Sequence, residues 1–195
     1  TVMDLQLSGK RALVTGSTSG IGFAIAQSLA AEGADVIING RGRAGVAAAL
    51  ERFEQAAPGG KVRGIAADLG TATGCEQLVK ACPDVDILVN NMGIFDPKPF
   101  EEIPDEEWFH FFETNVMSGV RLTRHYLPAM KQRNWGRVVF ISSESGICPP
   151  AEMVHYGMSK SAQLSVARGI AETCVGSGVT VNSVLPGPTR TEGVA

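Results

Sequence analysis

The alternation of short apolar runs with helical stretches predicts an α/β fold, built on a doubly wound parallel sheet with helices on both faces. The apolar runs are rich in valine and isoleucine and are nearly continuous, which is typical of strands buried on both sides. A glycine-rich turn follows the first run, and 195 residues suit one domain. We therefore expect residues 1–195 to form a single Rossmann-type domain with right-handed crossovers.

The first half of the chain supplies four of the expected strands and three of the helices. The strands are expected at residues 11–15, 35–39, 62–66 and 86–90. The helices are expected from the glycine turn to about residue 32, over residues 44–55 and near residues 75–81.

The second half continues the same alternation. A long helix is expected over residues 105–132, strands over 138–142 and 179–184, and a further helix over 156–174. Asp105, Glu106 and Glu107 suit the first turn of the long helix, because acidic side chains oppose the positive end of the helix dipole. We assign them that role rather than one as paired catalytic carboxylates.

Composition and charge exclude several classes of function. A net charge of −3 gives no basic footprint for nucleic acid, and no run approaches the roughly 18 apolar residues that span a membrane. The four cysteines form no Cys-x-x-Cys pair and have no histidine at metal-ligand spacing, so no metal site is expected. Free thiols and the lack of an apolar signal segment at residues 1–4 indicate a reducing cytoplasm. The expected partner is a small molecule.

The turn after the first strand has the composition of a phosphate-binding loop. Gly16, Gly20 and Gly22 allow tight backbone angles and let the main chain approach an anion, while the following helix supplies unpaired N–H donors. The spacing is Gly-x-x-x-Gly-x-Gly, which differs from the commonest dinucleotide fingerprint. A purely structural strand-to-helix turn is the alternative, and the strand–turn–helix context favours the cofactor interpretation.

The end of the second strand distinguishes between two cofactors. An acidic residue there would accept hydrogen bonds from the adenosine ribose, whereas this chain has Gly40 followed by Arg41 and, two residues later, Arg43. A guanidinium is well shaped to hold a 2′-phosphate, so NADP(H) is favoured and NAD(H) stays possible. Arg41 is the better candidate; the alternative for both arginines is a solvated surface position.

Ser143, Tyr156 and Lys160 have the side chains and spacing for proton transfer to a carbonyl oxygen. A phenol has a pKa near 10, and Lys160 lies one helical turn beyond Tyr156, so its charge and that of the oxidised nicotinamide are expected to lower the pKa of the tyrosine. Tyr156 would then act as general acid or base, while Ser143 would donate a hydrogen bond to the substrate oxygen. The alternatives are a surface tyrosine, a surface lysine and a serine that merely ends its strand. His155 adjoins Tyr156, but consecutive helical residues diverge by about 100°, so a direct role is not expected.

With the glycine loop and the Ser–Tyr–Lys spacing together, the sequence resembles the short-chain dehydrogenase/reductase family, especially the 3-oxoacyl-[acyl-carrier-protein] reductases. The resemblance covers about residues 7–191. It aligns residues 15–22 with the cofactor loop, Asp68 with the residue beside the adenine, and Asn-Asn-Met-Gly at 90–93 with the family's Asn-Asn-Ala-Gly. It also aligns residues 186–191 with the Pro-Gly segment beside the nicotinamide. Met92 and Ser19 depart from the family pattern, the latter from a position that is often basic in NADP-preferring relatives.

The resemblance completes the expected site. The catalytic residues are Asn115, Ser143, Tyr156 and Lys160, with Asn115 holding a water and Lys160 also binding the nicotinamide ribose. The substrate contacts are Ser143, Ser145 and Tyr156. The cofactor-binding residues are Gly16, Ser17, Ser19, Gly20, Ile21, Gly22, Arg41, Asp68, Leu69, Asn90, Gly93, Tyr156, Lys160, Pro186, Gly187, Thr189 and Thr191.

The expected function is therefore NADP(H)-dependent hydride transfer between nicotinamide and a ketone or secondary alcohol. A cofactor-binding regulator or scaffold without turnover is the alternative, and different chemistry on the same cofactor, such as epimerisation, is a third. Family members usually continue past the Pro-Gly segment, so we expect the domain to lack its C-terminal substrate loop and last strand after Ala195. The resemblance also implies a homodimer or homotetramer formed through the helices at 105–132 and 156–174.

Overall fold

A single parallel sheet forms the centre of the computed structural model, which describes residues 4–56 and 60–191. In this part of the chain the sheet contains, in spatial order, β3 (Val62–Ala66), β2 (Asp35–Gly40), β1 (Arg11–Val14), β4 (Ile87–Asn90), β5 (Gly136–Ile141) and β6 (Val179–Val184). All neighbouring pairs are parallel, which confirms the predicted fold class.

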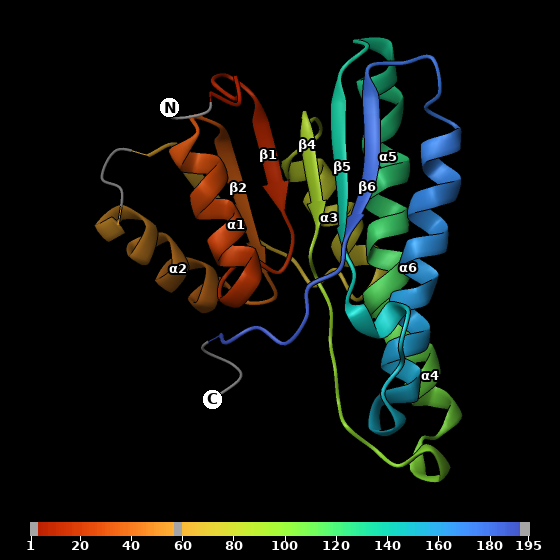
Figure 1. Cartoon of the computed structure of the whole chain (residues 1–195). Helices are drawn as coiled ribbons and strands as arrows, with labels where there is room; N and C mark the ends of the chain where they lie inside the picture. The colour runs from red at the N-terminus through yellow and green to blue at the C-terminus, as the bar shows by residue number, and fades with distance from the viewer. Residues whose placement is uncertain (1–3, 57–59, 192–195) are drawn as a thin grey trace.

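Helices cover both faces of the sheet (Figure 1). One face carries α1 (Gly20–Ala31) and α2 (Arg43–Ala56), and the other carries α3 (Ala72–Ala81), α5 (Ser118–Gln132) and α6 (Val154–Glu172). The connections also contain α4 (Asp105–Phe112) and short 3₁₀ turns named η1 (Phe100–Glu102), η3 (Glu144–Gly146) and η4 (Ala151–Met153).

The strand order reverses between β1 and β4. Leu13 of β1 pairs with Ile37 of β2 on one side and with Leu88 of β4 on the other. The chain then builds outward in opposite directions from these two central strands. In open sheets of this kind, the connections that leave the two strands diverge and create a ligand crevice at the carboxyl edge.

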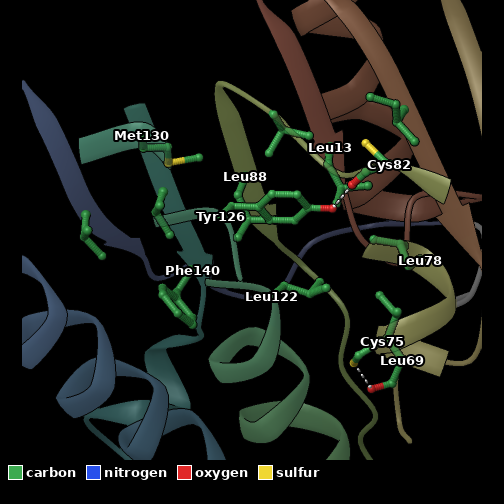
Figure 2. Packing of buried hydrophobic residues seen from close by; sticks show 14 of the residues in the cluster. Leu13, Leu69, Cys75, Leu78, Cys82, Leu88, Leu122, Tyr126, Met130 and Phe140 are labelled. Atoms are coloured by element: carbon green, nitrogen blue, oxygen red, sulfur yellow. Dashed lines mark hydrogen bonds between the residues drawn. The ribbon is translucent and has the colours of Figure 1, made fainter. Parts of the chain in front are cut away.

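Two apolar cores lie between the sheet and its helices. On the α3, α5 and α6 side, the ring of Tyr126 is fully buried beside Leu88 and Phe140, and its hydroxyl donates a 2.6 Å hydrogen bond to the carbonyl oxygen of Cys82 (Figure 2). On the other side, Phe23 of α1 packs against Phe53 of α2 with ring centroids 4.3 Å apart.

The expectation of one continuous helix over residues 105–132 is wrong. The helix is interrupted by a π-helical turn, η2 (Glu113–Met117), which separates α4 from α5. Asn115 in this turn bonds to the backbone of Ile94 rather than facing solvent. Such turns arise from one inserted residue and are common at functional sites.

The other elements agree with the prediction apart from their ends. The helix expected at 156–174 begins at Val154 and ends at Glu172, and α3 begins at Ala72 because the Thr71 hydroxyl caps it by accepting a hydrogen bond from the Gly74 N–H. The expectations for residues 1–3 and for the chain end at Ala195 fall outside the described residues.

Candidate active site

A cleft of about 380 Å³ opens at the carboxyl edge of the sheet, where the strand order reverses. Both halves of the chain contribute to it, so residues far apart in sequence lie on one wall or the other. Its lining includes the predicted site residues Gly16, Ser19, Gly20, Ile21, Gly22, Gly93, Ser143, Tyr156, Lys160, Pro186, Gly187, Thr189 and Thr191.

The glycine loop needs glycine at three positions for two different reasons. Gly16 and Gly20 have φ values of 57° and 58°, in the left-handed region that favours glycine. Gly22 is required by space, because a Cβ there would lie 2.4 Å from Asn91 Nδ2 and 2.6 Å from the Gly16 carbonyl oxygen. Glycine at these positions therefore lets the backbone of the loop line the cleft.

Two asparagines that are not among the predicted site residues hold the loop: Asn39, which is buried, and Asn91, which is partly buried in the cleft lining. Asn39 Oδ1 accepts a 3.3 Å hydrogen bond from the Gly16 N–H, and Asn91 Nδ2 donates to the carbonyl oxygens of Thr15 and Gly16 at 2.9 and 3.0 Å. Both residues occur at the ends of buried strands. An amide at the end of an apolar run was the available signal.

The first turn of α1 fits an anionic group. Its N-cap residue is Ser19, whose side chain makes no capping hydrogen bond, and no acidic residue lies in the turn. The first N–H groups of a helix lack intrahelical partners and carry a partial positive charge. The cradle of glycines and free donors therefore fits the pyrophosphate of a dinucleotide.

Ser143, Tyr156 and Lys160 converge on the opposite wall of the cleft. The side chains of Ser143 and Tyr156 lie beside each other in the lining, and Ser143 Oγ accepts a 3.1 Å hydrogen bond from the Ser145 N–H. Lys160 Nζ lies 5.5 Å from the centroid of the Tyr156 ring and donates a 3.0 Å hydrogen bond to the carbonyl oxygen of Ile141. The ammonium and the phenol therefore share one face of α6, as their spacing predicts.

Burial changes the acidity of both groups. It lowers the pKa of Lys160 to about 8, since the ammonium is held away from water. Burial also raises the pKa of Tyr156, while the neighbouring Ser143 hydroxyl acts in the opposite direction. Lys160 is not among the groups that shift the pKa of Tyr156 in the protein alone, so the expectation that its charge and the oxidised nicotinamide together lower that pKa stays a prediction.

Asn115 occupies the π-helical turn and links three segments of the chain. Its Oδ1 accepts a 2.7 Å hydrogen bond from the Ile94 N–H, and its Nδ2 donates to the Ile94 carbonyl oxygen and to Ser159 Oγ at 3.0 and 2.9 Å. Its own carbonyl oxygen accepts a 2.6 Å hydrogen bond from Gln163 Nε2. The side chain thus positions the segment after β4, next to Lys160.

Gly93 lies where this segment passes the lysine. A Cβ at Gly93 would be 3.3 Å from Lys160 Nζ and 3.5 Å from Asn115 Oδ1. The position keeps space in the cleft beside the ammonium.

Other predicted cofactor residues lie outside the lining of this cleft. The side chains of Ser17, Leu69 and Asn90 are buried in the protein, so they could reach a ligand only through the backbone. Ser17 Oγ donates to the Val14 carbonyl oxygen, and Asn90 Nδ2 donates to Thr123 Oγ1.

Arg41 and Asp68 are exposed beyond the ends of β2 and β3. Asp68 Oδ1 accepts a hydrogen bond of 3.1 Å from the Gly70 N–H. Arg41 forms no ion pair with any residue that the structure describes. Their cofactor roles remain predictions.

His155 turns away from the cleft, in keeping with the angle between consecutive helical residues. Its ring is fully buried, packs against Phe111 with centroids 4.0 Å apart, and places Nε2 3.4 Å from Glu107 Oε1. Glu107 in turn forms an ion pair with Lys98. This contact joins α6 to α4 one residue before Tyr156.

A second pocket, of about 860 Å³, adjoins the cleft at Ser143 and Tyr156. Ser145, a predicted substrate contact, also lines it although the residue is nearly buried. The remaining lining includes Phe95, Ile147, Cys148, Pro150, Met153 and Leu185. The pocket therefore presents an apolar wall to any molecule that reaches the Tyr156 hydroxyl.

The described residues form neither a metal site nor a membrane-spanning helix. Between residues 4–56 and 60–191, no group of three or more histidine, cysteine or acidic side chains is placed to hold a metal ion. Over the same residues, no helix combines the length and apolar character needed to cross a bilayer.

The family model described as short chain dehydrogenase matches residues 10–195. The chain belongs to the short-chain dehydrogenase family.

Relatives of this short-chain dehydrogenase agree in sequence and in structure. The chain is 56% identical over 192 residues to the oxidoreductase YvaG of Bacillus subtilis, covering 98% of this chain and 73% of the relative. It is 34% identical over 192 residues to the 3-oxoacyl-[acyl-carrier-protein] reductase FabG of Vibrio cholerae, covering 96% and 77%. The L-sorbose reductase of Gluconobacter frateurii, solved with NADPH and L-sorbose, has a TM-score of 0.92 at 32% identity, covering 98% of this chain and 74% of that one.

These findings confirm the resemblance drawn from the sequence and assign the class of reaction. The protein is an NAD(P)-dependent dehydrogenase or reductase, which transfers hydride between a nicotinamide cofactor and a small-molecule carbonyl or alcohol.

Proposed function

We propose that this short-chain dehydrogenase is an NADP(H)-dependent ketone reductase and secondary-alcohol dehydrogenase in which Tyr156 is the general acid and base. The observation that carries the proposal is the convergence of Ser143, Tyr156 and Lys160 on the wall that faces the glycine cradle. Proton transfer and dinucleotide binding are thereby brought to one cleft.

The resting protonation state of Tyr156 already suits the reductive direction. Because burial raises the pKa of Tyr156, the phenol keeps its proton at neutral pH and can give it to a carbonyl oxygen. The nicotinamide, when bound, supplies the hydride to the carbonyl carbon or accepts it from the alcohol. Ser143 lies beside the phenol and can donate a hydrogen bond to the same oxygen as negative charge develops on it.

Lys160 supplies positive charge next to the phenol. Its Nζ lies 5.5 Å from the Tyr156 ring, so it favours the phenolate that remains after proton donation. The same ammonium lines the cofactor cleft and would hold the ribose hydroxyls of the nicotinamide half.

Preference for NADP(H) would depend on Arg41. Its exposed guanidinium follows β2 at the adenosine end of the expected cofactor path, and the strand ends without a carboxylate there. A guanidinium matches a 2′-phosphate through two parallel hydrogen bonds. The NADPH in the similar L-sorbose reductase structure supports this choice. Arg41→Ala should weaken NADPH binding roughly tenfold or more and leave NADH binding nearly unchanged.

The cellular setting and assembly are part of the same proposal. We place the enzyme in the cytoplasm, consistent with four free cysteines. We also propose a homodimer or homotetramer, supported by the exposed apolar side chains of Phe109 and Phe112 on α4.

The test is NADPH oxidation, followed by absorbance, with a panel of neutral ketones. Tyr156→Phe should lower kcat by roughly 10²–10⁴-fold while NADPH binding, measured by protein fluorescence, is retained. Tyr126→Phe is the matched control, because it removes the chain's other phenol from the core. Turnover that survives in Tyr156→Phe would show that the assigned acid is wrong.

A further inference from the structure

We propose that the substrate of this enzyme is uncharged near its reacting carbonyl and that Glu144 and Glu152 exclude carboxylate substrates. The inference rests on the proposed function, since it concerns the pocket that receives the ketone. The evidence for it is the charge of the side chains that line that pocket, since the catalytic residues alone do not determine which substrates bind.

The pocket has two acidic side chains and no basic one. Among the described residues that line it, Glu144 and Glu152 are acidic, and no lysine, arginine or histidine is present. The remaining walls are largely apolar. A substrate carboxylate would therefore lose water and gain no cationic partner.

Two lysines near the pocket have partners outside it. Lys160 lines the cofactor cleft rather than this pocket, and its ammonium donates to the Ile141 carbonyl oxygen. Lys98, on the loop after β4, is paired with Glu107 of α4. Neither ammonium is placed to neutralise an anion in the substrate pocket.

Glu144 lies close to the reacting centre. It follows Ser143 directly, and its backbone N–H donates a 3.1 Å hydrogen bond to the Pro186 carbonyl oxygen. Its Oε2 lies 3.3 Å from the place where a Cβ on Gly187 would be, so the carboxylate faces the segment shared by cleft and pocket. A negative charge in this position repels an anion and can accept hydrogen bonds from hydroxyl or amide groups of a neutral substrate.

The test compares two ketones of nearly the same shape that differ in charge, acetoacetate and methyl acetoacetate. Turnover is followed with NADPH, and binding to the NADP⁺-loaded protein is followed by calorimetry. The neutral ester should have a kcat/KM and an affinity that exceed those of the acid by roughly tenfold or more. Added salt should reduce this ratio, because it screens the carboxylates.

A double substitution and a control test whether Glu144 and Glu152 cause the preference for the ester over the acid. Glu144→Gln combined with Glu152→Gln should bring the ester-to-acid ratio toward one, mainly by improving binding of acetoacetate. Glu76→Gln, which removes an exposed carboxylate on α3 far from the pocket, should leave the ratio as it is.

The outcomes separate this inference from the proposed function. Equal affinity for ester and acid, tighter binding of the acid, or no binding of either would overturn the inference, whatever the turnover. Binding of the ester without turnover of any ketone would support the charge preference and contradict the reductase activity. A ratio that the double substitution does not change would overturn the assignment to Glu144 and Glu152.

Discussion

Lys160 has to satisfy two opposing physical demands. Its ammonium is useful next to Tyr156 because positive charge stabilises a phenolate, yet only 4% of the residue is exposed. One hydrogen bond, to the Ile141 carbonyl oxygen, replaces part of the lost hydration. The residue therefore favours catalysis at a cost to the stability of the folded protein.

The cost should be measurable as a dependence of stability on pH. The pKa of Lys160 falls from 10.5 to about 8 on folding, so between these values the unfolded chain binds more protons and stability rises with pH. Relative to Lys160→Met, the wild-type free energy of unfolding should rise by up to about 1.4 kcal/mol per pH unit in that window. Below about pH 8 the difference should be flat. Lys80→Met, which removes an exposed lysine of α3, should show no such slope in denaturant titrations.

Gly22 allows a specific prediction about cofactor binding. In Gly22→Ala the new methyl group would overlap Asn91 Nδ2 and the Gly16 carbonyl oxygen, so the loop must shift. We expect NADPH affinity to fall roughly tenfold or more, measured by fluorescence titration. Gly169→Ala, where nothing lies within 4 Å of the new Cβ on α6, should keep the affinity and stabilise the helix by about 0.5–1 kcal/mol. Unchanged affinity in Gly22→Ala would contradict the role of the loop.

The π-helical turn η2 is the element that connects the helices to the catalytic groups. It brings Asn115 between the segment after β4 and α6, where one amide satisfies both backbone groups of Ile94 and the hydroxyl of Ser159. Each residue of a regular α-helix is rotated by about 100° about the axis, so without the extra residue of the π-helical turn the Asn115 side chain would point in a different direction. The π-helical turn therefore lets Asn115 hold the segment after β4 in place beside Lys160.

Removal of this amide should loosen the loop and lower activity together. Asn115→Ala leaves the partly buried backbone groups of Ile94 without their partner, at a cost of up to about 1–3 kcal/mol each, so the protein should be destabilised and kcat should fall more than NADPH affinity. Hydrogen exchange at the Ile94 amide should speed up. Ser159→Ala, which removes one of the three hydrogen bonds, should have a smaller effect on all three measurements. Equal effects of the two variants would contradict the role assigned to Asn115.

The elements differ in how far the sequence alone could predict them. Continuous β-branched runs such as 35–39 gave the strands, since a parallel strand covered on both faces needs apolar residues throughout. The hydrophobic pattern over 105–132 has no break at Glu113–Met117, so the π-helical turn was missed. Tyr156 and Lys160 were found by spacing. Their burial, which decides the direction of the pKa shift of Tyr156, depends on tertiary packing and was not predictable.

At the scale of the whole molecule, the two cores on opposite faces of the sheet stabilise a single arrangement of β1 and β4. The core on the α5 side includes a polar group, because the Tyr126 hydroxyl reaches the Cys82 carbonyl oxygen at 2.6 Å inside it (Figure 2). This contact fixes the end of α3 against α5. The hydrogen bonds by which Asn39 and Asn91 hold the glycine loop could not be predicted from the sequence, because they join segments that meet only in the assembled sheet.

Tyr126→Phe should therefore destabilise the whole protein. The Cys82 carbonyl oxygen would lose a buried partner, which costs about 1–3 kcal/mol in the free energy of unfolding. Met130→Leu in the same core conserves volume and should cost less than about 1.5 kcal/mol. Denaturant titrations should show a lower midpoint for Tyr126→Phe with an unchanged slope.

The two hydrogen bonds that flank Lys160 have a consequence for ligand recognition. Its Nζ donates to the Ile141 carbonyl oxygen and its own carbonyl oxygen accepts from Ser142 Oγ at 2.9 Å, so the end of β5 restrains the residue at both backbone and tip. Immobilising a free lysine side chain costs up to about 2 kcal/mol in entropy. Here the Lys160 side chain is already ordered by folding. Binding of a dinucleotide to it therefore does not have to offset the loss of side-chain entropy.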